Sequence, residues 1–123
     1  MVASIDRDEL KAKIDQGDQF VLLEVLGLPY YRHSHLPGAL NLPPGKVEEM
    51  ALTLLPDKDA EVVLYCWDEE FPTSKQAARE LAAMGYTNVR DYVEVKQAWV
   101  AAGLPVEGRS RRARRRGREE GAQ

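Results

Sequence analysis

The sequence predicts an α/β fold in which a parallel sheet is covered by helices on both faces. Two observations support this class. Short apolar runs typical of buried strands occur at 20–25 and 62–65, and amphipathic segments with helical spacing alternate with them. Glycine and proline mark the ends of these segments. Strands that alternate with helices pair in parallel, because each helix carries the chain back across the sheet.

The first helix is expected directly after Asp6, which is a suitable cap. Glu9 stands at the third helical position, where its side chain completes a capping box. Gly17 is a natural end for this helix. The strand expected at 20–25 has a nearly continuous apolar run, which is typical of a strand buried on both faces.

The segment 26–44 is rich in glycine and proline, so we expect loop over most of it and a short strand at 39–42. A helix is expected over 46–55, because its apolar residues recur with helical spacing. Pro56 ends that helix, since proline cannot continue the hydrogen-bonding pattern.

The second half of the chain repeats the alternation. After the strand at 62–65, the run Thr73-Ser74-Lys75-Gln76 has the form of a capping box for a helix that Gly85 closes. A last strand is expected at 88–92. A closing helix that contains Trp99 follows, and Trp99 is expected in the core.

Length and composition fit one globular domain. The chain has 123 residues, of which 44% are hydrophobic and 30% charged, enough for a core that needs no disulfide or metal. The single cysteine excludes an intramolecular disulfide and a multi-cysteine zinc site. An unpaired thiol, with no signal peptide, favours the cytoplasm. No stretch approaches the roughly 20 apolar residues that cross a bilayer, so no membrane partner is expected.

Charge is distributed unevenly within the net charge of −3. Residues 109–123 carry seven arginines against two glutamates, whereas 1–108 carry ten basic and eighteen acidic residues. We therefore expect a folded domain at 1–108 and an Arg-rich disordered tail at 109–123. Such a tail is suited to weak nonspecific contact with nucleic acid or an acidic partner, or to docking on the acidic residues 68–70.

Cys66 is the residue to which the chain's chemistry points. It stands where the strand at 62–65 passes into a loop and then a helix. At the carboxyl end of a buried strand, loop amides and the positive end of a helix dipole favour a thiolate. The alternative is an inert buried cysteine, the more common role of a lone one.

Five motifs in order resemble a known family. They are Leu22-Leu23-Glu24-Val25, His35-Leu36-Pro37-Gly38-Ala39-Leu40-Asn41-Leu42-Pro43, Val63-Leu64-Tyr65-Cys66, the run from Ala77 to Val89, and the run from Ala98 to Val106. Together they resemble a single-domain rhodanese-like protein of the sulfurtransferase family. The resemblance covers essentially 1–107.

The resemblance implies a five-stranded parallel sheet between helices and a sulfurtransferase activity. Cys66 would carry a persulfide, receiving sulfur from a small donor such as thiosulfate or from a protein sulfur carrier, and passing it to a thiophilic acceptor. No cofactor or metal is needed, because loop amides stabilise the anions. The substrate-binding loop would comprise Trp67, Asp68, Glu69, Glu70, Phe71, Pro72, Thr73 and Ser74, named here the cysteine loop.

Two further residues take structural roles near the site under this resemblance. Glu24 stands where the family usually has aspartate, and His35 orients the Pro37-Gly38 turn. His33 and His35 form a His-x-His pair, but two ligands without a third nearby make a weak metal site, so no metal is expected.

The chain departs from the family pattern around the cysteine. The cysteine loop is about two residues longer, lacks glycine and has Thr73 where an arginine is usual, and Leu26 also replaces an arginine. The paired glycines before the final helix are replaced by Glu94 and Val95. The loop acids oppose a thiolate, by about 3 kcal/mol for one carboxylate ~6 Å away at an effective dielectric near 20.

These departures leave two further hypotheses. The acidic loop favours either a cationic or protein-borne sulfur partner, or a weakly active or inactive rhodanese-like module that binds a protein through residues 67–74. A cysteine phosphatase or arsenate reductase needs an arginine that closes the loop as in Cys-x5-Arg. Phe71 and Pro72 stand there instead, so this class is disfavoured.

Overall fold

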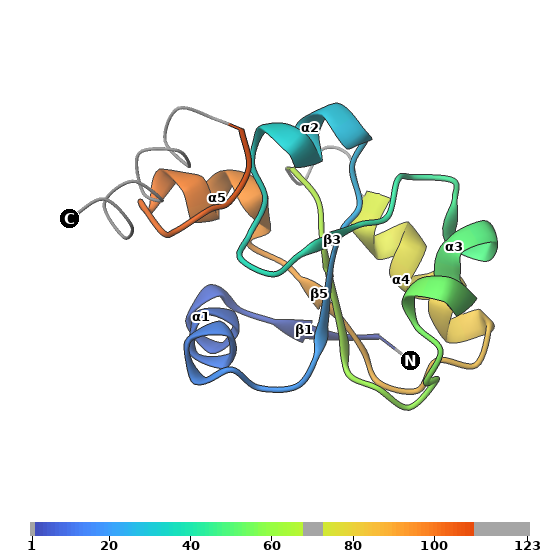
Figure 1. Ribbon diagram of the computed structural model, residues 1–123. Coiled ribbons are helices and arrows are strands. Elements are labelled where there is room, and N and C mark those ends of the chain that lie inside the picture. Colours follow the sequence, from blue (N-terminus) through green and yellow to red (C-terminus); the bar gives the residue numbers. More distant parts are fainter. Residues whose placement is uncertain (1, 68–72, 110–123) are drawn as a thin grey trace.

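The computed structural model describes residues 2–67 and 73–109. Its centre is a five-stranded sheet with the strand order β1-β5-β4-β2-β3, in which every neighbouring pair is parallel (Figure 1). The strands are β1 Val2–Ile5, β2 Val21–Glu24, β3 Leu40–Asn41, β4 Val62–Tyr65 and β5 Val89–Tyr92. The helices are α1 Arg7–Gln16, α2 Leu28–His33, α3 Val47–Leu54, α4 Thr73–Ala83 and α5 Val95–Ala101. The predicted α/β class and the five-stranded parallel sheet are confirmed.

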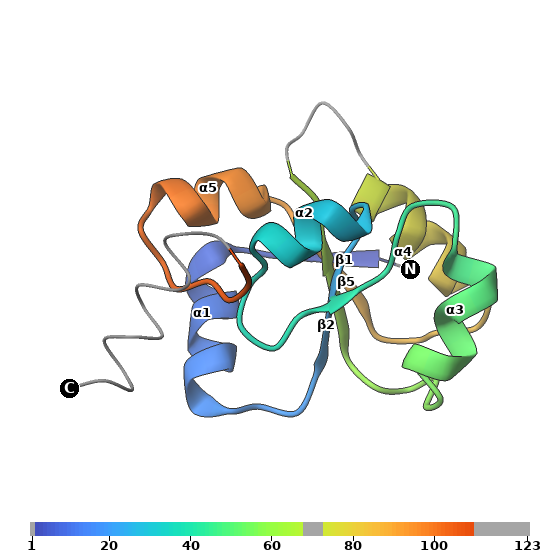
Figure 2. The ribbon, with the colours of Figure 1, turned by 45° about the horizontal axis from the view of Figure 1, so that its top comes forward.

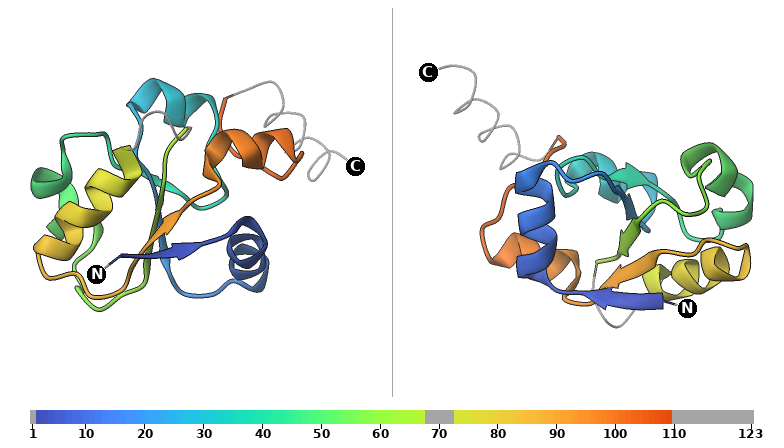
Figure 3. Two further views of the ribbon diagram at one scale, coloured as in Figure 1. Left: turned by 180° about the vertical axis from the view of Figure 1, so that it is seen from behind. Right: turned by 90° about the horizontal axis from the view of Figure 1, so that it is seen from below.

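Helices cover both faces of the sheet, with α3 and α4 on one face and α1 and α5 on the other (Figure 3). Each face has its own buried cluster. Leu23, Leu64 and Leu81 belong to the cluster beneath α3 and α4, and Val63 and Trp99 to the one beneath α1 and α5. Alternate residues of β2 and β4 thus supply the two cores, as the period of a strand requires.

β4 is the middle strand, and Cys66 directly follows its carboxyl end. The connection after β2 contains α2 and leads to β3, at one edge of the sheet. The connection after β4 contains α4 and leads to β5, in the opposite direction across the sheet. In open α/β sheets, such a reversal between neighbouring strands opens a crevice where ligands bind. Figure 2 shows α2, α5 and the start of α4 around this end of β4.

Two elements differ from the sequence-based expectation. β1 at Val2–Ile5 was not predicted, because only Ile5 of it is buried and its pairing partner, β5, lies far along the chain. The segment 28–33 was predicted as loop but forms α2. Pro29 stands in the first turn of this helix, where proline needs no hydrogen-bond donor.

The helix ends follow the predicted signals except in α4. The Asp6 carboxylate accepts the Glu9 N–H at 2.8 Å, and Gly17 ends α1 with a left-handed φ of 70°. α4 begins at Thr73 itself, so the expectation that Thr73 caps the helix was wrong. Its hydroxyl instead donates to the Val25 carbonyl at 2.8 Å and ties α4 to the end of β2.

Within 2–67 and 73–109, no helix is long and apolar enough to cross a bilayer. The predicted tail at 109–123 lies outside the described residues apart from Arg109, whose N–H donates to the Arg32 carbonyl at 2.7 Å. The division into a domain and a tail stays a prediction.

Tyr92 gives the fold a testable dependence on pH. Its ring is buried edge-on against Trp99, and its hydroxyl has no hydrogen-bond partner among the described residues. Burial, and next the Glu94 carboxylate, raises the pKa of Tyr92 to about 12. A raised folded-state pKa contributes stability that is complete below pH 10.0, the unfolded value, and is lost as pH rises through about 12.

Between pH 10.0 and about 12, we therefore expect the free energy of unfolding of Tyr92→Phe to fall less steeply than that of wild type, because phenylalanine cannot ionise in the unfolded chain. At neutral pH the substitution is expected to be nearly neutral, since an unpaired buried hydroxyl leaves. Urea unfolding from neutral pH into the window measures both effects. Tyr30→Phe, at an exposed ring, is the control and should keep the wild-type slope. Identical slopes for Tyr92→Phe and wild type would contradict the assignment.

Candidate functional site

Cys66 directly follows β4, the central strand, and is 3% exposed. Its Sγ accepts a hydrogen bond from the Ser74 hydroxyl at 3.3 Å. Ser74 is itself buried, in the first turn of α4. The predicted geometry, a thiol at a strand end facing the start of a helix, is therefore present for these two residues.

The amino-terminal turn of α5 holds the backbone on either side of the thiol. The Lys96 N–H donates to the Cys66 carbonyl at 2.9 Å, and the Gln97 N–H donates to the Trp67 carbonyl at 3.0 Å. The Trp67 side chain is 39% exposed, so it borders the site without being buried in the core. The start of the cysteine loop is thus fixed by α5 as well as by β4.

The predicted substrate-binding loop is only partly described. Of its residues, the structure describes three: Trp67 directly after Cys66, and Thr73 and Ser74 in the first turn of α4. Asp68, Glu69, Glu70, Phe71 and Pro72 lie outside the described residues. A cradle of loop amides around the sulfur therefore stays a prediction, as does the effect of the three acids on the thiol.

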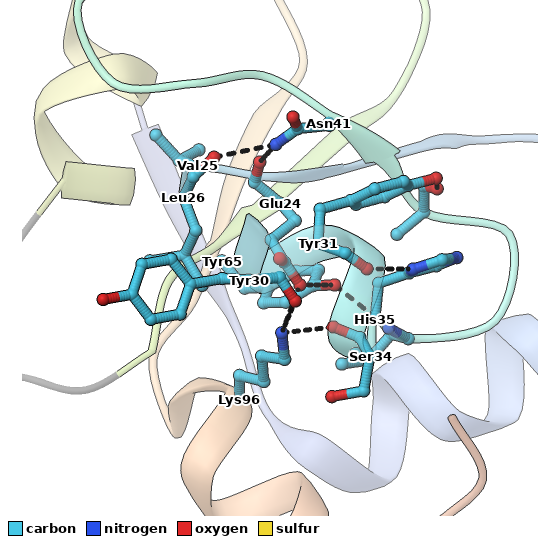
Figure 4. A network of polar contacts seen from close by, with 12 residues as sticks. Glu24, Val25, Leu26, Tyr30, Tyr31, Ser34, His35, Asn41, Tyr65 and Lys96 are labelled. Atoms are coloured by element: carbon cyan, nitrogen blue, oxygen red, sulfur yellow. Dashed lines mark hydrogen bonds and ion pairs between the residues drawn. The ribbon is translucent and has the colours of Figure 1, made fainter. Parts of the chain in front are cut away.

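Glu24 lies at the carboxyl end of β2, fully buried, and anchors a network of polar contacts (Figure 4). Its Oε1 accepts the Tyr65 hydroxyl at 2.8 Å and forms an ion pair with Lys96 Nζ at 2.9 Å. The Tyr65 hydroxyl in turn accepts the Leu36 N–H at 3.0 Å. Glu24 thus connects the residue before Cys66 to α5 and to the segment after α2.

The network shifts the titration of its buried members. Burial, and next the Glu24 carboxylate, raises the pKa of Tyr65 well above its usual range. Burial lowers the pKa of Lys96, and its hydrogen bond and attraction to Glu24 oppose that shift in part. The Tyr65 hydroxyl therefore remains a donor to Glu24 at neutral pH.

His35 contacts Tyr31 through its side chain and Glu107 through its backbone, and its predicted role in orienting the Pro37-Gly38 turn stays a prediction. Its Nδ1 lies 2.7 Å from the Tyr31 carbonyl, and its ring stacks on Tyr31 with a centroid distance of 3.9 Å. Its backbone pairs with Glu107, whose carboxylate accepts the Gly38 N–H at 3.0 Å. The Gly38 N–H is therefore bound by Glu107, the residue whose backbone pairs with that of His35. In the part of the chain that the structure describes, no three histidine, cysteine, aspartate or glutamate side chains gather as metal ligands would.

A cavity of about 420 Å³ lies beside the site, between α4 and the edge strand β1. Lys75, the first basic residue after Cys66, lines it together with Arg79 and Asp91. Asp91 is buried next to Ser74. Burial raises the pKa of Asp91, and hydrogen bonding to Ser74 opposes that shift. Asp91 is thus a buried acid close to the residue that contacts the thiol.

Sequence reasoning missed Lys96, Tyr65 and Asp91 as parts of the site. For Lys96 a signal existed, because a glutamate within a buried strand needs a cation as its partner. Lys96 lies three residues before Trp99, so the two side chains share the buried face of the predicted helix. Tyr65 and Asp91 gave no such signal. Their roles depend on partners that only the fold brings close.

Comparison with known proteins agrees with this geometry. The rhodanese-like domain family matches residues 6–102 of the 123-residue chain. The protein therefore belongs to the rhodanese-like domain family, as the motifs of the sequence predicted.

Two curated relatives carry names from sulfur chemistry. The chain is 26% identical over 98 residues to the putative sulfur carrier protein YrkF of Bacillus subtilis, covering 80% of this chain and 51% of that protein. It is 39% identical over 61 residues to the thiosulfate sulfurtransferase PspE of Escherichia coli, covering 50% of this chain and 57% of that protein. The chain spans just over half the length of each.

A solved structure shows the same architecture. The rhodanese-like domain of the Alr3790 protein from Anabaena superposes with a TM-score of 0.76 at 27% sequence identity. The match covers 89% of this chain and 81% of that one. The sheet and the helices around Cys66 are thus those of a rhodanese-like domain.

The hydrogen bond from Ser74 to sulfur can be tested directly. We expect Ser74→Ala to slow alkylation of Cys66 by iodoacetamide at neutral pH about fivefold, because the attacking sulfur loses one hydrogen bond worth about 1 kcal/mol. Mass spectrometry of the alkylated protein over time gives the rate. Ser4→Ala, on the edge strand, is the matched control and should react like wild type. A Ser74→Ala rate equal to or above that of wild type would contradict the role assigned to this hydroxyl.

Proposed function

We propose that this rhodanese-like protein transfers a sulfane sulfur through a persulfide on Cys66. The observation that carries the proposal is the position of the thiol, at the end of the central strand with the Ser74 hydroxyl 3.3 Å from its sulfur. A nucleophilic cysteine needs stabilisation of its anion, and this placement supplies one donor and the amino-terminal turn of an eleven-residue helix.

The proposed reaction has two steps. In the first, the Cys66 thiolate attacks the outer sulfur of a donor such as thiosulfate. A new S–S bond forms, the S–S bond of the donor breaks, and sulfite leaves with the electron pair. In the second step, an acceptor such as cyanide or a thiolate attacks the outer sulfur of the persulfide, and Cys66 leaves as thiolate. Charge is balanced in both steps, and no metal or redox cofactor takes part.

The names of the relatives support the same reaction class. One is named a thiosulfate sulfurtransferase and the other a putative sulfur carrier protein. We propose that the acidic residues 68–70 of the cysteine loop favour a protein-borne donor or acceptor over free thiosulfate, because like charges repel a small dianion. A protein partner can meet the same acids with basic side chains.

Incubation with thiosulfate, followed by intact mass measurement, tests the proposal. We expect the mass to rise by one sulfur atom, and we expect cyanide then to remove that sulfur as thiocyanate. Cys66→Ser should show neither change. Repeating the loading with a low-molecular-weight persulfide as donor separates donor preference from inactivity.

A wild-type protein that gains no sulfur from either donor would contradict sulfur transfer. That result would favour the alternative, a rhodanese-like module that binds a protein through residues 67–74. Its supporting observations are the 3% exposure of Cys66 and the acidic sequence of the loop.

A further inference from the structure

Lys96 is a buried cation with a complete set of partners. Its side chain is 2% exposed, and its ammonium has three protons to donate. One goes to Glu24 Oε1 at 2.9 Å, one to the Ser34 carbonyl and one to the Tyr30 carbonyl at 3.4 Å. Figure 4 shows Nζ between the Glu24 carboxylate and the Ser34 carbonyl. The side chain of Lys96 therefore joins α5 to the end of β2 and to the carboxyl end of α2.

The backbone of the same residue holds Cys66. The Lys96 N–H donates to the Cys66 carbonyl, while the Cys66 sulfur lies against Ser74 of α4. The ion pair of Lys96 and Glu24 therefore lies on the face of the sheet that α5 covers. The Cys66 sulfur lies on the opposite face, which α4 covers. Because the peptide bond is trans, a Cys66 carbonyl directed at α5 turns the Trp67 N–H the opposite way. The connection from Lys96 to the thiol runs through this peptide.

The turn that presents the Lys96 N–H is strained. Val95, at the start of α5, has a φ of 62°, the left-handed region that a β-branched side chain rarely occupies. Within the described residues it is the only non-glycine with positive φ. Strained backbone persists only where its surroundings enforce it. The immediate neighbour of Val95 supplies such enforcement, with three side-chain bonds and one backbone bond.

We infer that Lys96 is a positioning residue for Cys66. Its buried ammonium, held by Glu24 and the α2 carbonyls, fixes the strained first turn of α5, and that turn fixes the Cys66 peptide at the end of β4. The inference rests on the proposed function in one respect, that Cys66 is the reacting residue. It assigns a role in the site to a lysine whose ammonium binds Glu24 and the α2 carbonyls.

Lys96→Met tests this role, because methionine keeps most of the apolar stem and removes the ammonium. We expect faster hydrogen exchange at the amides of residues 96 and 97, and alkylation of the buried Cys66 by iodoacetamide about tenfold faster, as the loss of a charge-assisted bond lets the turn open. We expect the turnover number of sulfur transfer to fall about tenfold with little change in KM, because the thiol is reached more easily but held less well. A purely structural role would not drive these two rates in opposite directions.

Arg90→Met is the matched control. Arg90 pairs with Glu9 and Glu61 near the amino-terminal end of β4, away from Cys66, so its loss removes a networked cation without touching the turn. We expect lower stability but wild-type alkylation and transfer. Equal effects of Arg90→Met and Lys96→Met, or no effect of Lys96→Met, would overturn the inference.

The double variant Lys96→Met/Glu24→Gln separates the effect of Lys96 on the position of Cys66 from the cost of leaving the Glu24 carboxylate buried and unpaired. Glutamine still accepts the Tyr65 hydroxyl but leaves no unpaired buried charge, so we expect the melting temperature to recover while alkylation stays fast. Recovery of both to wild-type values would overturn the inference. Hydrogen exchange and alkylation need no sulfurtransferase activity, so they decide on Lys96 even if the protein takes up no sulfur from any donor.

Discussion

The buried ion pair between Glu24 and Lys96 is the interaction on which the site depends. An ion pair removed from water gains little net stability, because desolvation offsets the attraction of the charges. This ion pair instead joins secondary-structure elements to one another. Glu24 ends β2, Lys96 lies in the first turn of α5, and Tyr65 joins them from β4 through a hydroxyl whose raised pKa keeps it a donor. Three elements that are distant in sequence are thereby held around one peptide, that of Cys66.

The alternation of a strand explains how one element serves both the scaffold and the chemistry. Tyr65 and Cys66 are consecutive, so their side chains leave β4 on opposite faces. The hydroxyl of Tyr65 enters the network beneath α5, and the thiol of Cys66 meets Ser74 of α4. The scaffold on one face can thus fix the backbone without occupying the space in which the sulfur reacts.

Local patterns predicted most of the fold, because most elements carry their own signals. The strands at 21–24 and 62–65 are buried apolar runs, and α1 has both its cap and its terminal glycine. β1 and α2 carry weak signals, since β1 has one buried residue and α2 has none. Cys66 and His35 could be placed from motif order, and Ser74 from its position at the end of the cysteine loop. For Lys96 the only signal was that the buried Glu24 needs a cation. Its position beside the Cys66 peptide depends on a partner 72 positions earlier in the sequence and on a strained turn that no local pattern indicates.

Amide NMR of the protein during sulfur loading tests the central claim, that Cys66 is the reacting residue and that α5 holds its peptide. On addition of thiosulfate or a small persulfide donor, the account predicts shifts at the amides of Trp67, Ser74, Lys96 and Gln97. In Cys66→Ser these shifts should be absent. Shifts that persist in Cys66→Ser, or loading of wild type that leaves the α5 amides unmoved, would contradict the account.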